Sequence, residues 1–190
     1  METIFPLRPV PPFSLDLTAW ALQRRQGNLI DRWDGRTYRR VLTVEGGAIE
    51  IAVGGAGEAG RTLGATIKAE PLAPETAQII KGQLERTLGI RADLSDFYRM
   101  AEKDPRLKPL ALRFRGLKPP RLFSIYEGLM NGIACQQLSL ALGIQLLGRL
   151  ARRFGPSVVN GDSVSYGFPR PQDLANAKAE EIKKLAPWWG

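Results

Sequence analysis

The spacing of apolar residues changes near residue 92, and this change constrains the fold more than any other feature of the sequence. Upstream, apolar and polar residues alternate in 37–44 (TYRRVLTV), 48–53 (AIEIAV) and 62–70 (TLGATIKAE), as in strands with one buried face. Downstream, apolar residues recur at intervals of three and four, as in helices. The sequence therefore predicts an α+β fold in two domains, with a small antiparallel sheet and a helix in 1–92 and an all-α layer in 93–190.

Turn-forming and helix-terminating residues support this prediction for the first domain. Glu45-Gly46-Gly47 between two of the strands is typical of a hairpin turn, and 13–18 (FSLDLT) alternates as a further strand would. The segment 73–89 predicts a helix with Pro74 in its first turn and Gly89 at its end. The glycines of 55–60 fit G-x-G-x-x-G, but a strand-like segment follows them instead of a helix. We interpret 55–60 as a hairpin loop and not as a nucleotide site.

About five helices are predicted in the second domain. Two short ones lie in 93–103 and 104–116, the extended segment 117–121 (LKPPR) follows, and a last, shorter helix begins near Pro171. Two more apolar helices are predicted between 117–121 and this last helix, and Gly155 ends the second of them. Their predicted stripes are Tyr126, Leu129, Met130 and Ile133 in the first, and Leu140, Ile144, Leu147, Ala151 and Phe154 in the second.

The composition excludes several kinds of chemistry. The chain of 190 residues has no histidine and one cysteine, Cys135. It therefore lacks Ser–His and Cys–His nucleophile pairs, histidine metal ligands and multi-cysteine clusters, and we expect neither a cofactor nor a bound metal. No apolar run approaches the ~18 residues of a membrane span, and the N-terminus has no signal pattern, so we expect a cytoplasmic protein.

Positive charge is concentrated in the second half. The net charge of the chain is +8, and residues 93–190 carry 15 Lys and Arg against 9 Asp and Glu. Eight of these basic residues lie between Arg99 and Arg121, where there are only two acidic ones. An excess of this kind favours a polyanionic partner such as nucleic acid. A solvated helix face would give the same pattern, so the charge run alone does not distinguish a nucleic-acid interface from an ordinary surface.

A pair of glutamines interrupts the apolar helical region. Residues 135–138 leave the apolar stripe, and Ser139 is a candidate N-cap for the helix that follows. Backbone amides at a helix start can bind a phosphate, and amide side chains at such a turn can reach the base edges of a groove. Alternatively, Gln136 and Gln137 cap helix ends and face water. The residues themselves leave both interpretations open.

The segment 113–155 resembles the core of the helix-hairpin-helix superfamily of DNA glycosylases, in particular the 3-methyladenine (alkylated-base) branch. The family pattern is roughly G-L-R-P-P-R, an apolar helix, I-x-G-Q-Q-x-S, and a second apolar helix that ends in R-F-G. The matching segments here are 116–121 (GLKPPR), 136–139 (QQLS) and 153–155 (RFG), while Cys135 stands where the family usually has glycine. The strand-rich first domain also resembles that branch's N-terminal domain, which has a TATA-binding-protein-like layout.

The resemblance implies base-excision DNA repair, in which double-stranded DNA with alkylated bases such as 3-methyladenine is bound and the damaged base is flipped out and excised. It places Gln137 as the wedge that fills the gap in the duplex and Gln136 beside the flipped base. Ser139, Lys118 and Arg121 are the expected phosphate contacts.

No catalytic residue is identified. The family's helix-hairpin-helix and its catalytic aspartate have no counterpart in these 190 residues, and neither Asp162 nor Asp173 lies in a matching motif. We therefore expect this chain alone to be inactive, either as a partial form or as a chain completed by a C-terminal segment or a second chain. A non-catalytic DNA-binding module on the same scaffold and a helical interaction protein are the alternatives.

Overall fold

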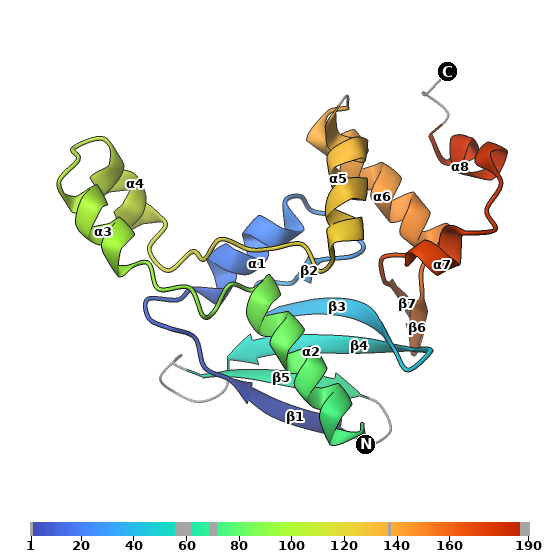
Figure 1. Cartoon of the computed structure of the whole chain (residues 1–190), viewed down its shortest axis with the longest axis horizontal. Helices are drawn as coiled ribbons and strands as arrows, with labels where there is room; N and C mark the ends of the chain where they lie inside the picture. Colours follow the sequence, from blue (N-terminus) through green and yellow to red (C-terminus); the bar gives the residue numbers. More distant parts are fainter. Residues whose placement is uncertain (1, 56–61, 69–71, 137, 187–190) are drawn as a thin grey trace.

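The structure is a computed structural model and describes residues 2–55, 62–68, 72–136 and 138–186. Its elements in chain order are β1 (Glu2–Leu7), α1 (Leu15–Gln23), β2 (Arg32–Trp33), β3 (Thr37–Val44), β4 (Gly47–Gly55), β5 (Leu63–Lys68), α2 (Pro74–Thr87), α3 (Ser95–Glu102), α4 (Leu107–Arg113), α5 (Ile125–Gln136), α6 (Leu140–Phe154), β6 (Ser157–Asn160), β7 (Ser163–Tyr166), α7 (Pro171–Leu174) and α8 (Ala179–Leu185). In Figure 1 the sheet lies at the base, and α3–α4 and α5–α6 rise from it as two separate lobes.

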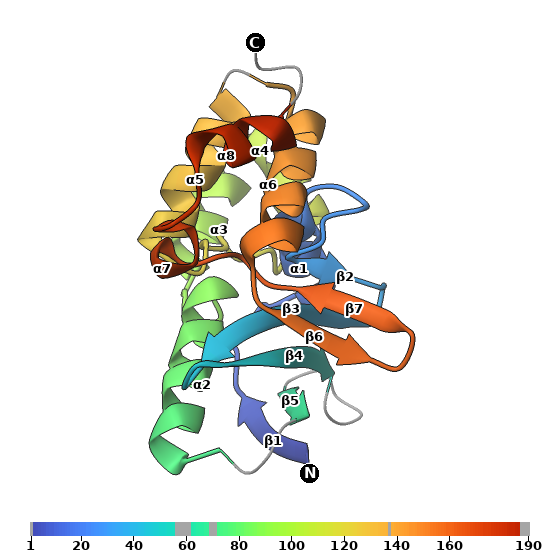
Figure 2. The same ribbon diagram turned by 90° about the vertical axis from the view of Figure 1, so that its right-hand side faces the viewer.

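The N-terminal sheet has the strand order β1-β5-β4-β3-β2, with every neighbouring pair antiparallel. The predicted hairpin is confirmed, because Val44 pairs with Gly47 across a two-residue turn in which Glu45 and Gly46 have φ of 50° and 81°. Alternate side chains of β4 and β5 are buried, and α2 packs Ile80 and Leu84 against them. Figure 2 shows α2 on one side of the sheet and the β6–β7 hairpin on the other.

The strand predicted for 13–18 is wrong, because these residues begin helix α1. Ser14 is its N-cap, and the Ser14 side-chain oxygen accepts a hydrogen bond from the Leu17 amide at 3.2 Å. The apolar–polar alternation covers only six residues, whereas Thr18, Ala19 and Leu22 recur at helical spacing and are buried. A capped start followed by good helix formers therefore outweighs a short alternating pattern.

The second half contains the expected helices, except that the last one is divided into α7 and α8, and one strand pair that the all-α prediction missed. β6 and β7 form a hairpin in which Asn160 pairs with Ser163, so Gly161 and Asp162 make its turn. The hairpin is joined to β3 through a bridge between Val41 and Gly167. The segment between α6 and α7 is therefore an extension of the N-terminal sheet region and not a loop of the helical layer.

Two hydrophobic clusters form the interior. The first contains the buried residues of the sheet, α1 and α2, and the second contains Ile30 with residues of α5 and α6 and Phe168. The division into domains 1–92 and 93–190 stays a prediction. Each cluster includes a residue from the other side of this boundary, because Ile30 lies in the second cluster and Phe123 packs on the first. Within the described residues, no helix is both long and apolar enough to cross a membrane.

Candidate nucleic-acid interface

The turn between α5 and α6 is on the surface, as its proposed role requires. Gln136 is the last residue of α5 and is exposed, and Ser139 is the N-cap of α6, accepting a hydrogen bond from the Leu142 amide at 3.3 Å. The prediction that Ser139 caps this helix is confirmed. Gln137, the predicted wedge, lies outside the described residues. Figure 1 shows that α5 and α6 meet at the end of their lobe that points away from the sheet.

Close packing of α5 on α6 fixes the base of this turn. A Cβ atom at Gly143 would lie 2.6 Å from the Sγ of Cys135 and 3.0 Å from the Ala134 carbonyl oxygen. Only glycine therefore allows the two helices to approach this closely. Cys135, which departs from the family pattern, fills the space beside Gly143. Further along α6 the predicted stripe is confirmed at Ile144, Leu147 and Ala151, which are buried, but it is wrong at Leu140, which is 44% exposed.

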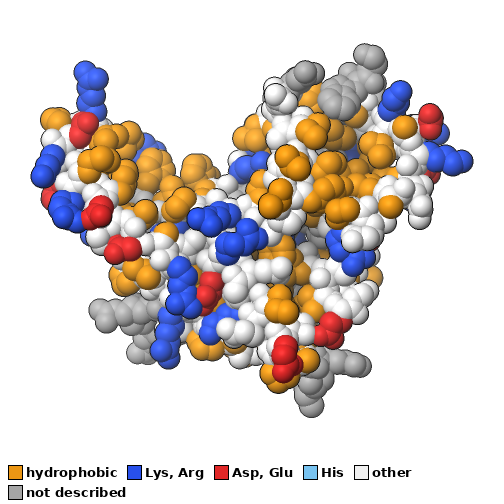
Figure 3. Space-filling view, viewed as in Figure 1, with side chains coloured by type: hydrophobic (Ala, Val, Ile, Leu, Met, Phe, Trp, Pro, Cys, Tyr) orange, Lys and Arg blue, Asp and Glu red, His pale blue; other side chains and the backbone are white. Residues whose placement is uncertain are grey.

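The predicted stripe on α5 is divided between two faces. Tyr126 and Met130 pack on the second cluster, whereas Leu129 and Ile133 are exposed together with Ile125, which is 84% exposed. Figure 3 shows apolar side chains on both walls of the hollow between the two lobes. The inner face of α5 instead carries two buried polar residues, Glu127 and Asn131.

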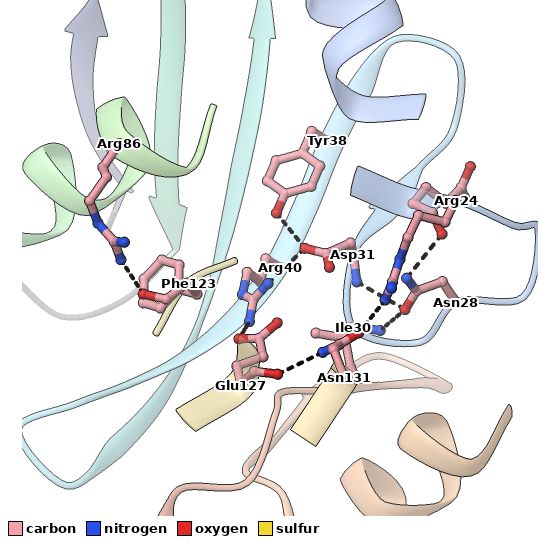
Figure 4. A network of polar contacts seen from close by, with 11 residues as sticks. Arg24, Asn28, Ile30, Asp31, Tyr38, Arg40, Arg86, Phe123, Glu127 and Asn131 are labelled. Carbon is pink, nitrogen blue, oxygen red and sulfur yellow. Dashed lines mark hydrogen bonds and ion pairs between the residues drawn. The ribbon is translucent and has the colours of Figure 1, made fainter. Parts of the chain in front are cut away.

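A buried polar network connects α5 to the sheet (Figure 4). The Arg40 guanidinium donates from Nη1 to Asp31 Oδ1 at 2.7 Å and from Nη2 to Glu127. The Tyr38 hydroxyl donates to the same Asp31 oxygen at 2.6 Å. The Asn131 side-chain amide donates to the Glu127 carbonyl at 3.0 Å. Removing one partner of such a buried ion pair typically costs about 3–5 kcal/mol, because the other charge is left buried and uncompensated.

The same surroundings shift the protonation of this network. Burial raises the pKa of Glu127, and the Asp31 charge adds to the rise while Arg40 opposes it. Burial and the Asp31 charge also raise the pKa of Tyr38 well above its usual value. Burial alone would lower the pKa of Arg40, but the Asp31 and Glu127 carboxylates reverse this and raise it, so Arg40 stays charged.

A hollow of about 740 Å³ lies beside the start of α6. Trp20, Trp33, Arg24, Arg25 and Leu140 contribute to its lining. Indole rings offer flat surfaces on which a base can stack, and arginines favour a polyanion. This hollow was not predicted from the sequence. Trp20, Arg24, Arg25 and Trp33 lie within fourteen residues and were a signal for it, but only the fold brings them to the start of α6.

One side of this hollow is held by polar and aromatic contacts. The Trp33 indole donates to Asp16 at 3.1 Å, and Trp20, which is 56% exposed, stacks on Phe114 at a centroid distance of 6.5 Å. Arg24 donates from Nη2 to Asn131 Oδ1 at 2.5 Å. The lining of the hollow is thus linked directly to the inner face of α5.

The predicted phosphate contacts do not form one cluster. Lys118 is buried and its ammonium donates to the Ala92 carbonyl at 2.5 Å, so it presents no charge at the surface. Burial also lowers the pKa of Lys118, although Asp93 opposes the fall. Arg121 is exposed, but it precedes α5 while the glutamine turn follows it, and the twelve residues of α5 separate the two by about 18 Å. It lies instead with Arg86 and Arg91 in a separate hollow of about 390 Å³.

Two glycines of the matching motifs are required by the packing. Gly116 has φ of 90°, and its carbonyl accepts from the Ser14 amide at 2.8 Å. Gly155 ends α6 where an added Cβ would lie 2.1 Å from the Gly167 carbonyl oxygen. These positions, together with Lys118, show that parts of the matching segments serve the packing of the fold. Among the described residues, no cluster of Cys, Asp and Glu is arranged to hold a metal ion.

Comparison with solved structures identifies the fold. A 3-methyladenine DNA glycosylase from Archaeoglobus fulgidus superposes with a TM-score of 0.81 and 21% identity, covering 95% of this chain and 61% of that one. The protein MBOgg1, solved with a low-affinity DNA ligand, gives a TM-score of 0.67 at 20% identity over 96% of this chain and 57% of its own. This chain has a DNA glycosylase fold.

Sequence comparison agrees over a shorter segment. A DNA-3-methyladenine glycosylase of Bacillus subtilis is 34% identical over 94 residues, which cover 45% of this chain and 31% of the relative. An 8-oxoguanine glycosylase/lyase of Clostridium acetobutylicum, solved with double-stranded DNA, matches in structure with a TM-score of 0.66 at 14% identity, over 97% of this chain and 59% of its own. No family model matches the chain. The predicted resemblance to the DNA glycosylases, in particular the 3-methyladenine branch, is therefore confirmed, and the chain spans about a third of the curated relative.

Proposed function

We propose that this protein acts on alkylated DNA in base-excision repair, as a glycosylase that removes bases such as 3-methyladenine. The observation that carries the proposal is the exposed turn between α5 and α6, which lies beside a hollow with two tryptophans in its lining within a DNA glycosylase fold. The sequence match to a DNA-3-methyladenine glycosylase supports the alkylated-base substrate.

In the proposed complex the turn enters the duplex from the minor groove. A base inside the duplex cannot be attacked at its glycosidic bond, so it must first rotate out of the stack. Gln137 would fill the gap that it leaves and donate hydrogen bonds to the orphaned partner base. Gln136 would lie beside the gap. The amides at the start of α6, which Ser139 caps, would hold a backbone phosphate.

The hollow beside α6 would receive the rotated base. Its tryptophans would provide a stacking surface, and Arg24 and Arg25 would attract the flanking backbone. Arg121 would contact a phosphate outside this region, together with Arg86 and Arg91.

The glycosidic step itself needs a carboxylate close to the sugar, and we propose that residues 1–190 do not supply it. Asp162 lies in the turn of the β6–β7 hairpin, and Asp173 is held by Arg170 at 2.8 Å. We infer that a further segment of the protein, or a second chain, contributes the carboxylate. This chain alone would then bind and distort DNA without releasing a base. A non-catalytic DNA-binding module is the second candidate, because the described residues supply the exposed turn and the hollow but no assigned catalytic carboxylate.

Binding to two duplexes tests the insertion step. Replacing Gln137 with Ala is expected to weaken binding to an abasic-site duplex more than binding to the intact duplex, because only the former has a gap to fill. Gln145→Ala, at an exposed glutamine further along α6, is the matched control. Equal losses on both duplexes for Gln137→Ala would contradict the wedge role. Release of 3-methyladenine from alkylated DNA by the 190-residue chain would contradict the inference about the carboxylate.

A further inference from the structure

The inner face of α5 is attached to the N-terminal segment at two points. Glu127 binds Arg40 of β3, and Asn131, one helical turn later, binds Arg24 at the end of α1. Both α5 residues are buried, and the Asn131 amide also donates to the Glu127 carbonyl. Figure 4 shows these contacts as one connected set between the sheet and the helix.

Arg24 has an unusual backbone for its role. It is the C-cap residue of α1 and has φ of 60°, a conformation that non-glycine residues rarely adopt. Strained residues persist only where their surroundings hold them, and they concentrate at functional sites. Here the strained residue lines the hollow beside α6 and holds α5 through Asn131. One side chain therefore connects the lining of the hollow to the helix that carries the turn.

A buried polar network is a poor way to gain stability, because well-packed apolar residues would often serve as well or better. A directional network instead fixes geometry, and the geometry of α5 determines where its end lies. Over the twelve residues of α5, about 18 Å long, a tilt of about 10° would move the turn by roughly 3 Å. Displacements of about 1 Å already impair positioned sites.

We propose that Arg24 and Arg40 are positioning residues, which fix α5 against the sheet and thereby set how the glutamine turn enters DNA. This role rests on the proposed function and adds two residues that lie outside the turn. The Arg40–Glu127 pair anchors the first half of α5. The Arg24–Asn131 pair anchors the middle of α5 and connects it to the lining of the hollow.

The test compares the preference for an abasic-site duplex over the intact duplex, measured as the ratio of dissociation constants, in the 190-residue protein. Asn131→Ala removes the acceptor for Arg24, and Asn131→Asp keeps an oxygen for Arg24 but loses the amide donor to the Glu127 carbonyl. Ile80→Val, on the buried face of α2, is the control for a modest loss of stability far from the turn. The salt dependence of binding is measured in parallel, because it counts phosphate contacts.

The expected result is that Asn131→Ala lowers the preference about tenfold, which corresponds to about 1.4 kcal/mol, and leaves the salt dependence unchanged. Asn131→Asp should recover part of the preference, because it keeps the acceptor for Arg24 alone, and Ile80→Val should keep all of it. An Asn131→Ala protein with the wild-type preference would overturn the positioning role, as would an equal loss in Ile80→Val. If Asn131→Ala does not fold, Arg24→Lys replaces it with the same two outcomes. A wild-type protein that binds both duplexes equally would refute the proposed function, and the positioning role with it.

Discussion

Replacing Gly143 with Ala perturbs the contact between α5 and α6 directly below the glutamine turn. The added Cβ would lie 2.6 Å from Cys135 Sγ, 3.0 Å from the Ala134 carbonyl oxygen and 3.2 Å from the Cys135 Cα. The sulfur can rotate away, but the two backbone atoms can move only with the helix. Overpacking of this kind costs about 1–3 kcal/mol.

A second effect acts in the opposite direction. Alanine stabilises a helix interior by about 1 kcal/mol relative to glycine. The net expectation for Gly143→Ala is therefore a loss of about 0–2 kcal/mol in the free energy of unfolding. Gly132 provides the control, because it lies within α5 and a Cβ there would meet no atom within 4 Å. Gly132→Ala should accordingly stabilise the protein by about 1 kcal/mol.

Urea denaturation of five proteins separates these contributions: the wild type, Gly132→Ala, Gly143→Ala, Cys135→Ala and the double variant Cys135→Ala/Gly143→Ala. In the background of Cys135→Ala the closest contact is gone, so Gly143→Ala should cost less there than in the wild type. The remaining cost reflects the backbone of Ala134. If Gly143→Ala stabilised the protein as much as Gly132→Ala does, the close approach of α5 and α6 would be refuted.

Three further predictions concern other parts of the chain. Gly155→Ala should destabilise the protein by about 3 kcal/mol or more in urea denaturation, because its Cβ would lie 2.1 Å from a carbonyl oxygen, and a loss under 1 kcal/mol would contradict the packing there. A hydrogen bond from Arg39, supported by backbone amides, lowers the pKa of Asp34 from 3.8 to about 2, so stability from this group is present above pH 3.8 and lost as the pH falls towards 2. Asp34→Asn should reduce the pH dependence of the free energy of unfolding between about pH 2 and pH 3.8. An unchanged pH dependence in this range would contradict the lowered pKa. Lys118→Met should leave DNA affinity and its salt dependence unchanged, whereas Arg121→Ala should weaken binding and reduce the salt slope, and the reverse order would contradict the burial of Lys118.

The elements with long, regular patterns could be predicted from the sequence. The strands around Glu45-Gly46, helix α2 and helix α6 follow from alternation, turn residues and helical spacing, and the structure has each of them. The short elements could not be predicted in this way. The six alternating residues at 13–18 predicted a strand, but the Ser14 cap begins a helix there. The β6–β7 hairpin depends on contacts with β3, which is far away in the sequence.

The candidate site was predicted in part. The cap at Ser139 and the exposure of Gln136 follow from a polar interruption between two apolar helices. The burial of Lys118 could not be foreseen, because lysine is rarely buried and only the fold brings it to the Ala92 carbonyl. Equally, the contact between Arg24 and Asn131 joins residues 107 positions apart. Local patterns carry no information about such pairs.

The central claim is that the turn between α5 and α6 enters a duplex and displaces a base. It is tested most directly by the fluorescence of 2-aminopurine placed at the target position of a duplex, since the emission of this base rises when it leaves the stack. Binding of the wild-type protein and of Gln145→Ala should raise the emission, and Gln137→Ala should raise it much less at equal saturation. If all three proteins bound the duplex without any rise in emission, the account of this turn would be contradicted.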